Sequence, residues 1–266
     1  MQISIINDCF DENAKLRQVS RAGSVFQDAS VGSFAVCSEL EAAGFLIDAL
    51  DAFDGKEGVI LVNVAPRNGE AKKWKNGTPF GYFRFKNTLV VSSVDGLVLS
   101  LCNKLGLIDE FFLFDIEEVM DFISDKELDP AAKTRIVNTQ FRSFNFLPRA
   151  AGWVWKGYDL PKQEYNLGEI KEAPNAVWFI DNFGNAKTTF VGKDFNFKNG
   201  EEVEVSVGGE KKNLKFYESL RDLPDKEIGI VQGSSGIGDR RFLEIILQGG
   251  NVAKEFGIKI GDTVEI

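Results

Sequence analysis

Hydrophobic and polar residues recur with two different periods along the first part of the chain, and these periods predict strands and helices in turn. Residues 2–7 (QISIIN) have the apolar pattern of a first strand. Residues 38–53 place apolar side chains on a helical period, and Ser38 followed by Glu41 is the capping box that begins such a helix. The β-branched run GVILVNVAP at 58–66 then predicts a strand buried on both faces.

The pattern continues beyond these elements. Residues 12–26 mix charged and apolar positions at helical spacing, and a second helical segment covers about 129–137. Residues 79–96 predict two strands joined by a turn at Lys86–Asn87. Because strands and helices alternate, the sequence predicts an α/β N-terminal domain with a mostly parallel central sheet, over residues 1–155.

The composition and the hydrophobic pattern of the sequence change after this domain. Residues 156–175 combine prolines, glycines and charges without a sustained period, which is typical of a linker. From 176 to 266, short apolar or alternating runs are separated by Gly and Asn turns. This part predicts a smaller C-terminal antiparallel β-barrel.

Charge and hydropathy exclude some kinds of partner. The net charge of −9 leaves no basic excess with which to neutralise a phosphate backbone, so nucleic acid is not expected as a partner. No apolar run reaches the roughly 18–20 residues that span a membrane, and the first residues do not form a signal peptide. We expect a cytoplasmic protein with no membrane partner.

The chain contains no histidine, which removes the commonest general base and metal ligand. Ser-His-Asp and Cys-His hydrolases are therefore excluded, and no metal is expected. The three cysteines, Cys9, Cys37 and Cys102, are odd in number and form no CxxC motif. We expect them to be small buried side chains, not disulfides or zinc ligands.

Two local features have both a structural and a functional interpretation. The glycine-rich segment 233–238 (GSSGIG) has the look of a phosphate loop, but no Lys-Ser/Thr follows it and no helix begins there. A β-hairpin loop explains it better. Asp8, directly after the first strand, is either a turn former or a ligand-binding carboxylate at the carboxyl end of a strand.

Four motifs in the C-terminal part occur in a specific order. They are FIDNFGN at 179–185, Gly-Ser at 233–234, FLEI at 242–245 and AxxxGxxxGD at 253–262. In this order they resemble the C-terminal domain of the S-adenosylmethionine (SAM) hydroxide adenosyltransferases, the family that includes the fluorinases and chlorinases.

The N-terminal half resembles the same family more loosely. Asp8 matches an early family aspartate, residues 62–69 (VNVAPRNG) fall at a VVDPGVG-type turn, and residues 93–101 (SVDGLVLSL) at a PDNGLL segment. The resemblance implies an α/β domain, a C-terminal β-barrel, and a homotrimer with ligand sites between neighbouring subunits. It also implies SAM or adenosine as the ligand, with no separate cofactor.

The resemblance assigns roles to five residues. Asp8 would bind the ribose hydroxyls, Asp181 and Ser234 the methionine head group, and Phe183 and Asn185 the adenine or the ammonium. Carboxylates suit a diol and an ammonium, and aromatic rings suit adenine and a cation. The structural alternatives are a turn aspartate for Asp181 and barrel core for Phe183.

The chain departs from the family at the residues that activate water. Family hydrolases use an Asp-Arg-His set, and the three positions here hold Ala65, Lys72 or Lys73, and Phe141 or Arg142. The water-activating set is therefore absent.

Catalysis would then depend on the remaining polar residues. An electropositive anion pocket could be built from Arg67, Lys72, Lys73, Arg142 and Ser143, and Trp74 could form a wall for the adenosyl group; the alternative is that these cations lie on the solvated surface. We take Lys72, Lys73 and Arg142 as the catalytic candidates.

Three functions are compatible with these patterns. In the first, the protein displaces methionine from SAM with water, hydroxide or halide. In the second, it binds SAM or adenosine without turning it over. In the third, it is an unrelated α/β enzyme acting on a nucleotide or sugar.

Overall fold

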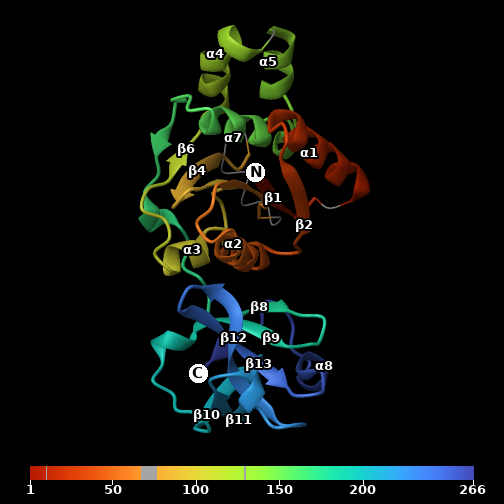
Figure 1. Ribbon diagram of the computed structural model, residues 1–266, viewed down its shortest axis with the longest axis vertical. Helices are drawn as coiled ribbons and strands as arrows, with labels where there is room; N and C mark the ends of the chain where they lie inside the picture. The colour runs from red at the N-terminus through yellow and green to blue at the C-terminus, as the bar shows by residue number, and fades with distance from the viewer. Residues whose placement is uncertain (10, 67–76, 129) are drawn as a thin grey trace. The chain divides into compact units, whose positions relative to one another are not determined.

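The structure, a computed structural model, describes residues 1–9, 11–66, 77–128 and 130–266. It divides into two compact units, residues 1–171 and residues 172–266 (Figure 1). They are called here the N-terminal and the C-terminal domain.

The N-terminal domain is built on a seven-stranded mixed sheet with the strand order β2-β1-β3-β5-β4-β6-β7. The first four strands in this order run parallel, and β4, β6 and β7 are added antiparallel to their neighbours. The strands are β1 (Gln2–Asn7), β2 (Ser30–Ala35), β3 (Gly58–Asn63), β4 (Phe80–Phe85), β5 (Thr88–Ser93), β6 (Phe112–Leu113) and β7 (Gln163–Glu164).

Helices cover both faces of this sheet (Figure 1). They are α1 (Glu12–Val25), α2 (Glu39–Phe53), α3 (Ser100–Lys104), α4 (Ile116–Glu127), α5 (Pro130–Val137), α6 (Arg142–Asn145) and α7 (Leu147–Trp155). The side chain of Ser38 caps α2 by accepting from the Glu41 amide at 3.1 Å, as the capping box predicts. α2 packs on β1 and β3, and α7 packs on β3 and β5.

The core of this domain follows from the strand register. Ile3 of β1 pairs with Val59 of β3, which pairs with Leu89 of β5, and all three side chains are fully buried. Since side chains alternate between the faces of a sheet, these rows form one apolar surface, on which α1, α4 and α7 pack. The β-branched composition of these strands reflects burial on both faces.

The C-terminal domain is a second seven-stranded sheet with the order β14-β10-β11-β12-β13-β9-β8, curled into a nearly closed barrel. An isolated bridge from Ala176 to Thr263 joins its two edges. Its elements are β8 (Val177–Ile180), β9 (Ala186–Val191), β10 (Glu202–Val207), β11 (Glu210–Tyr217), β12 (Ile228–Ile237), β13 (Arg240–Leu247), α8 (Val252–Phe256) and β14 (Val264–Glu265). Its own apolar core includes Val205, Ile230 and Ile245.

The predicted fold class is confirmed, with an N-terminal α/β domain and a C-terminal barrel. The parallel part of the N-terminal sheet is limited to β2, β1, β3 and β5, because β4 forms an antiparallel hairpin with β5. The stretch predicted as a linker, 156–175, contains β7, which pairs with β6, and the unit boundary lies at Lys171–Glu172.

The glycine-rich segment 233–238 forms less of a loop than predicted. Most of it belongs to β12, whose pairing with β13 is interrupted by a bulge between Gln232 and Gly236. The hairpin itself turns at Gly238–Asp239. A glycine is needed at 236 because its φ is +125° and an added Cβ would lie 2.3 Å from the Arg240 carbonyl oxygen.

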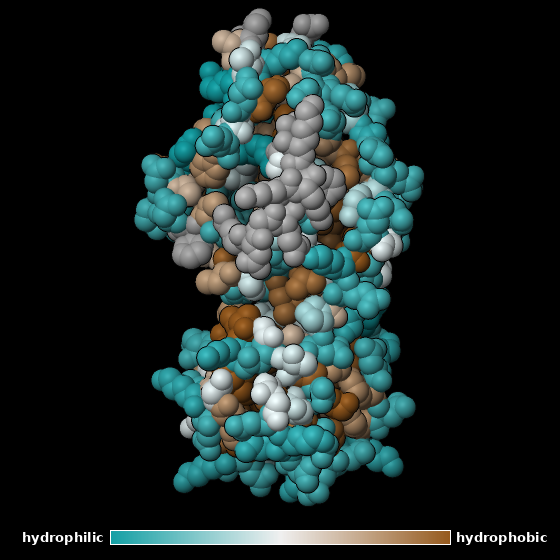
Figure 2. All heavy atoms as spheres, turned by 180° about the vertical axis from the view of Figure 1, so that it is seen from behind, coloured by the Kyte–Doolittle hydropathy of each residue, from teal (hydrophilic) through white to brown (hydrophobic). Residues whose placement is uncertain are grey.

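Figure 2 shows a mainly hydrophilic surface on the face that it presents, with apolar side chains scattered over it. No helix within the described residues is both long and apolar enough to cross a bilayer.

Candidate functional site

A cavity of about 260 Å³ opens at the carboxyl ends of the parallel strands in the N-terminal domain. Its walls include Asp8, Asn63 and Ser93, which lie at or directly after the ends of β1, β3 and β5. Open α/β sheets bind ligands at this edge, because several strands deliver loop residues to one place there.

The backbone of this wall is fixed by side chains from the strand ends. The Ser93 hydroxyl donates to the Val64 carbonyl oxygen at 2.5 Å, and the Val64 amide lies 3.3 Å from the same hydroxyl. The buried Asn7 side chain accepts from the Cys9 amide at 3.0 Å. The chain on both sides of Asp8 and just before Ala65 is therefore held in place.

A segment far along the chain also lines the cavity, with Phe141, Arg142 and Ser143 at the start of α6. The Arg142 guanidinium donates to the Gly77 carbonyl oxygen at 3.4 Å. Its carbon Cζ lies 5.8 Å from the centre of the Phe80 ring. Burial lowers the pKa of Arg142, and the group still carries its charge at neutral pH.

Gly77 is required for this position of the arginine. Its φ is +72°, and an added Cβ would lie 2.4 Å from the Arg142 Nη2 atom. Arg142 also takes part in no ion pair with a carboxylate among the residues that the structure describes. Its charge therefore remains available to an anion in the cavity.

Thr78 contributes a polar group that the sequence did not indicate. Its side chain is 5% exposed and lines the cavity. Within the described part of the chain, its hydroxyl has no hydrogen-bond partner. A buried hydroxyl without a partner is costly, and a bound ligand would remove this cost.

The cavity therefore collects several residues that the sequence singled out separately. Asp8, Ala65, Phe141, Arg142 and Ser143 all line it, although they are spread over more than half of the chain. The other candidates of this half, Arg67, Lys72, Lys73 and Trp74, lie outside the described residues.

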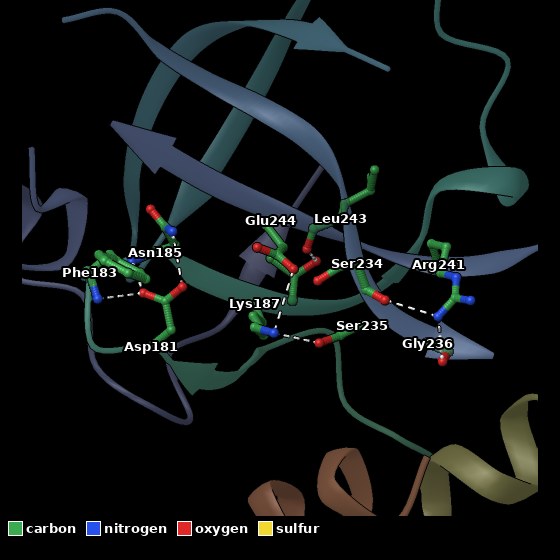
Figure 3. A network of polar contacts seen from close by, with 11 residues as sticks. Asp181, Phe183, Asn185, Lys187, Ser234, Ser235, Gly236, Arg241, Leu243 and Glu244 are labelled. Carbon is green, nitrogen blue, oxygen red and sulfur yellow. Dashed lines mark hydrogen bonds and ion pairs between the residues drawn. The ribbon is translucent and has the colours of Figure 1, made fainter. Parts of the chain in front are cut away.

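The C-terminal candidates Asp181, Phe183 and Asn185 share the turn between β8 and β9 (Figure 3). The Asp181 carboxylate accepts from the amides of Phe183 and Asn185, both at 2.9 Å, and from the Asn185 side chain at 3.0 Å. Asp181 therefore stabilises the turn, which was the structural alternative to a binding role for this residue. The Phe183 ring is 67% exposed, so its structural alternative, barrel core, is wrong.

Between this turn and Ser234 lies a buried charged cluster that the sequence analysis did not identify (Figure 3). Lys187 of β9 donates to the Ser235 hydroxyl and lies 3.7 Å from the Glu244 carboxylate, with side chains 15% and 7% exposed for Lys187 and Glu244. Ser234 itself is exposed, and its carbonyl oxygen accepts from Arg241 at 2.9 Å. A single charge inside each apolar run, AKTTFV at 186–191 and FLEIIL at 242–247, was the available signal.

The roles of these residues in binding remain predictions. The Asp181 carboxylate already accepts three hydrogen bonds, so a ligand ammonium would share it with the turn. The exposed Phe183 ring is accessible to a stacking partner such as a purine.

Comparison with known families decides what the C-terminal domain is. Residues 175–265 match the model of the SAM hydroxide adenosyltransferase C-terminal domain. This part of the chain belongs to that family. The SAM hydroxide adenosyltransferase domain thus covers the whole barrel, including the turn at Asp181 and the charged cluster, and the sequence-based recognition of it is confirmed. The match places the C-terminal domain in a SAM-related enzyme family.

Two solved structures share the fold along nearly the whole chain. An uncharacterized conserved protein from Thermotoga maritima is 16% identical with a TM-score of 0.72, and 99% of each chain is covered. A conserved hypothetical protein from Thermus thermophilus is 17% identical with a TM-score of 0.58, with 99% of this chain and 98% of that chain covered. At these identities the similarity shows the fold alone. No curated protein matches the chain in sequence.

Proposed function

We propose that this protein binds S-adenosylmethionine and displaces L-methionine from the ribose C5′ carbon with a small nucleophile, either water or a halide. The observation that carries the proposal is the cavity at the ends of β1, β3 and β5, which is lined by Asp8, Ala65, Phe141 and Arg142. The SAM-related family of the C-terminal domain supports the choice of ligand.

This displacement of methionine requires few catalytic groups from the protein. The nucleophile forms a bond to C5′ while the C5′–sulfur bond breaks, and the electron pair of that bond stays on sulfur, so methionine leaves as a neutral thioether. Because a sulfonium is a good leaving group, alignment and a dry site supply most of the acceleration. A water nucleophile also loses a proton, whereas a halide does not.

Each wall of the cavity has a place in this proposal. Asp8 binds the ribose hydroxyls, and Arg142 with the Thr78 hydroxyl attracts and orients an anionic nucleophile. At about 260 Å³ the cavity is slightly smaller than the roughly 300–1,000 Å³ of whole-ligand pockets, so it suits the ribose and the nucleophile and not all of SAM. The proposed assembly is the homotrimer that the family resemblance implies.

The second candidate function is a non-catalytic protein that binds SAM or adenosine. The observation that favours it is Ala65, which lines the cavity at the position where hydrolases of the family carry the water-activating aspartate. The chain also has no histidine with which to take a proton from water.

One experiment separates these functions. The purified protein is incubated with SAM, with and without chloride, and adenosine, 5′-chloro-5′-deoxyadenosine and methionine are followed by chromatography while binding is measured by calorimetry. Adenosine above the uncatalysed background indicates hydrolysis, and a chloride-dependent product indicates halide transfer. Binding without product indicates the second candidate, and absence of binding rejects both.

A variant pair tests the role of Asp8. Asp8→Asn removes a charged acceptor and should weaken SAM binding by about tenfold or more. Asp109→Asn removes an exposed carboxylate of the same domain and should leave binding unchanged. Equal affinities of the two variants for SAM would reject the assignment of Asp8 to the ribose.

A further inference from the structure

Arg17 of α1 contacts the segment that carries Phe141 and Arg142 into the candidate cavity. Its guanidinium carbon Cζ lies 4.6 Å from the centre of the Phe141 ring and 4.5 Å from the centre of the Phe144 ring. The two ring centres are 5.9 Å apart, and the rings are tilted by 35°. A cation within about 6 Å of a ring centre is attracted to the face of the ring, so one guanidinium holds both rings.

The segment needs such contacts because α6 is only four residues long. A helix of this length has little stability of its own and depends on tertiary contacts. The Thr139 hydroxyl oxygen accepts from the Phe141 amide at 3.1 Å and from the Asn145 side chain at 2.8 Å, which fixes the backbone. Arg17 fixes the Phe141 ring. Since Phe141 and Arg142 are consecutive and both line the cavity, the position of one constrains the other.

The same helix also supports the chain around Asp8. Gln18, the residue after Arg17, is buried, and its Nε2 atom donates to the Asn7 Oδ1 atom at 3.4 Å. The same oxygen accepts from the Cys9 amide at 3.0 Å. Two consecutive residues of α1 therefore contact two segments that lie far apart in the sequence and line one cavity.

We propose that Arg17 is a positioning residue for the displacement of methionine, and that it acts through Phe141 to hold Arg142 toward the nucleophile. The inference rests on the proposed function, in which Arg142 orients that nucleophile. Arg17 itself is exposed and does not line the cavity within the described residues, so it acts on the ligand only through the ring. A planar guanidinium suits this place because it stacks on aromatic faces, which an ammonium does less well.

The rate of methionine release from SAM, measured on the purified full chain with and without chloride, tests this role. Arg17→Ala should lower kcat by about fivefold or more and change the KM for SAM by less than about twofold, because the ribose ligand Asp8 is supported through Gln18 and not through Arg17. Arg17→Lys keeps a charge over the rings and should recover part of the lost kcat. Lys15→Ala removes another exposed cation of α1 and should keep the wild-type kcat.

The outcomes separate this inference from the proposed function. Wild-type kcat in Arg17→Ala, or an equal loss in Lys15→Ala, would overturn the positioning role alone. No product from the wild-type protein would reject the displacement of methionine, and the positioning role with it. Circular dichroism verifies that each variant is folded, and Arg17→Gln replaces Arg17→Ala if the latter does not fold.

Denaturant unfolding tests the contact itself without SAM. Arg17→Ala and Phe141→Leu remove the same interaction between α1 and the start of α6. The loss of unfolding free energy in the double variant should therefore be smaller than the sum of the two single losses. Additive losses would show that Arg17 does not hold Phe141 and would overturn the proposal.

Discussion

At the scale of single residues, two neighbouring positions, Gly77 and Thr78, shape the cavity around Arg142. The buried Thr78 hydroxyl lines the same cavity as Arg142 and has no hydrogen-bond partner among the described residues. A side chain at Gly77 would collide with the Arg142 guanidinium. A buried hydroxyl without a partner costs stability, and a ligand that bonds to it would restore this stability.

Replacing Gly77 by alanine should move Arg142 without unfolding the protein. The φ of +72° costs about 1–2 kcal/mol for a residue with a Cβ, while the overlap falls on the movable end of the arginine side chain. Gly106→Ala is the matched control, since its φ is +59° and nothing lies within 4 Å of an added Cβ. Denaturant unfolding should show similar losses, and a crystal structure should show Arg142 displaced in Gly77→Ala alone.

Replacing Phe183 by alanine should lower the affinity for SAM and leave the stability of the fold nearly unchanged. Because its ring is 67% exposed, the free energy of unfolding should change by about 0.5 kcal/mol or less. If the ring stacks on adenine, SAM affinity measured by calorimetry should fall by about tenfold. Leu220→Ala, a truncation at a residue 46% exposed in the same domain, should change neither quantity. Unchanged SAM affinity of Phe183→Ala would remove Phe183 from the site.

At the scale of elements, the candidate binding residues lie at the ends of strands and in the turns that follow them. Strand ends place Asp8, Asn63 and Ser93 along one edge of the N-terminal sheet. The short turn between β8 and β9 is held by the Asp181 carboxylate, so Asn185 has a fixed position at the start of β9. The strands thus form a rigid scaffold, and the candidate binding side chains lie at their ends.

The contact between α1 and α7 gives a prediction at this scale. Gly152→Ala improves helix propensity by up to about 1 kcal/mol but places a methyl group against Val25. We expect a net loss of about 1–3 kcal/mol in the free energy of unfolding, measured with denaturant. Adding Val25→Ala should relieve the overlap, so that Gly152→Ala costs much less in this background. An equal cost in both backgrounds would show that the helices do not meet there.

At the scale of the whole molecule, charge determines the response to pH. The chain has no histidine, so no side chain with an ordinary pKa changes charge between about pH 6 and 7.5. The pKa values of Asp159 and Asp239 are lowered by their lysine partners Lys162 and Lys193. Their contribution to stability is therefore present above the ordinary aspartate pKa and is lost only as the pH falls through the lowered values.

Calorimetry should therefore show an unfolding temperature that changes by no more than about 2 °C between pH 6 and 7.5, followed by a decline at acidic pH as carboxylates take up protons. A steep change of the unfolding temperature near neutral pH would mean that a carboxyl or amine titrates far from its usual range.

The sequence by itself determined the fold class, because hydrophobic periods of 2 and 3.6 residues are local properties of the chain. The β-branched run at 58–66 predicts a buried strand, which the structure has at Gly58–Asn63. It also determined the family of the barrel, since the motifs from 179 to 262 keep their order along the chain. Only the tertiary structure decided which residues meet, because contacts between distant parts of the chain depend on how the elements pack. Phe141 and Arg142 line the same cavity as Asp8, and the pairing of β9 with β13 sets Lys187 opposite Glu244.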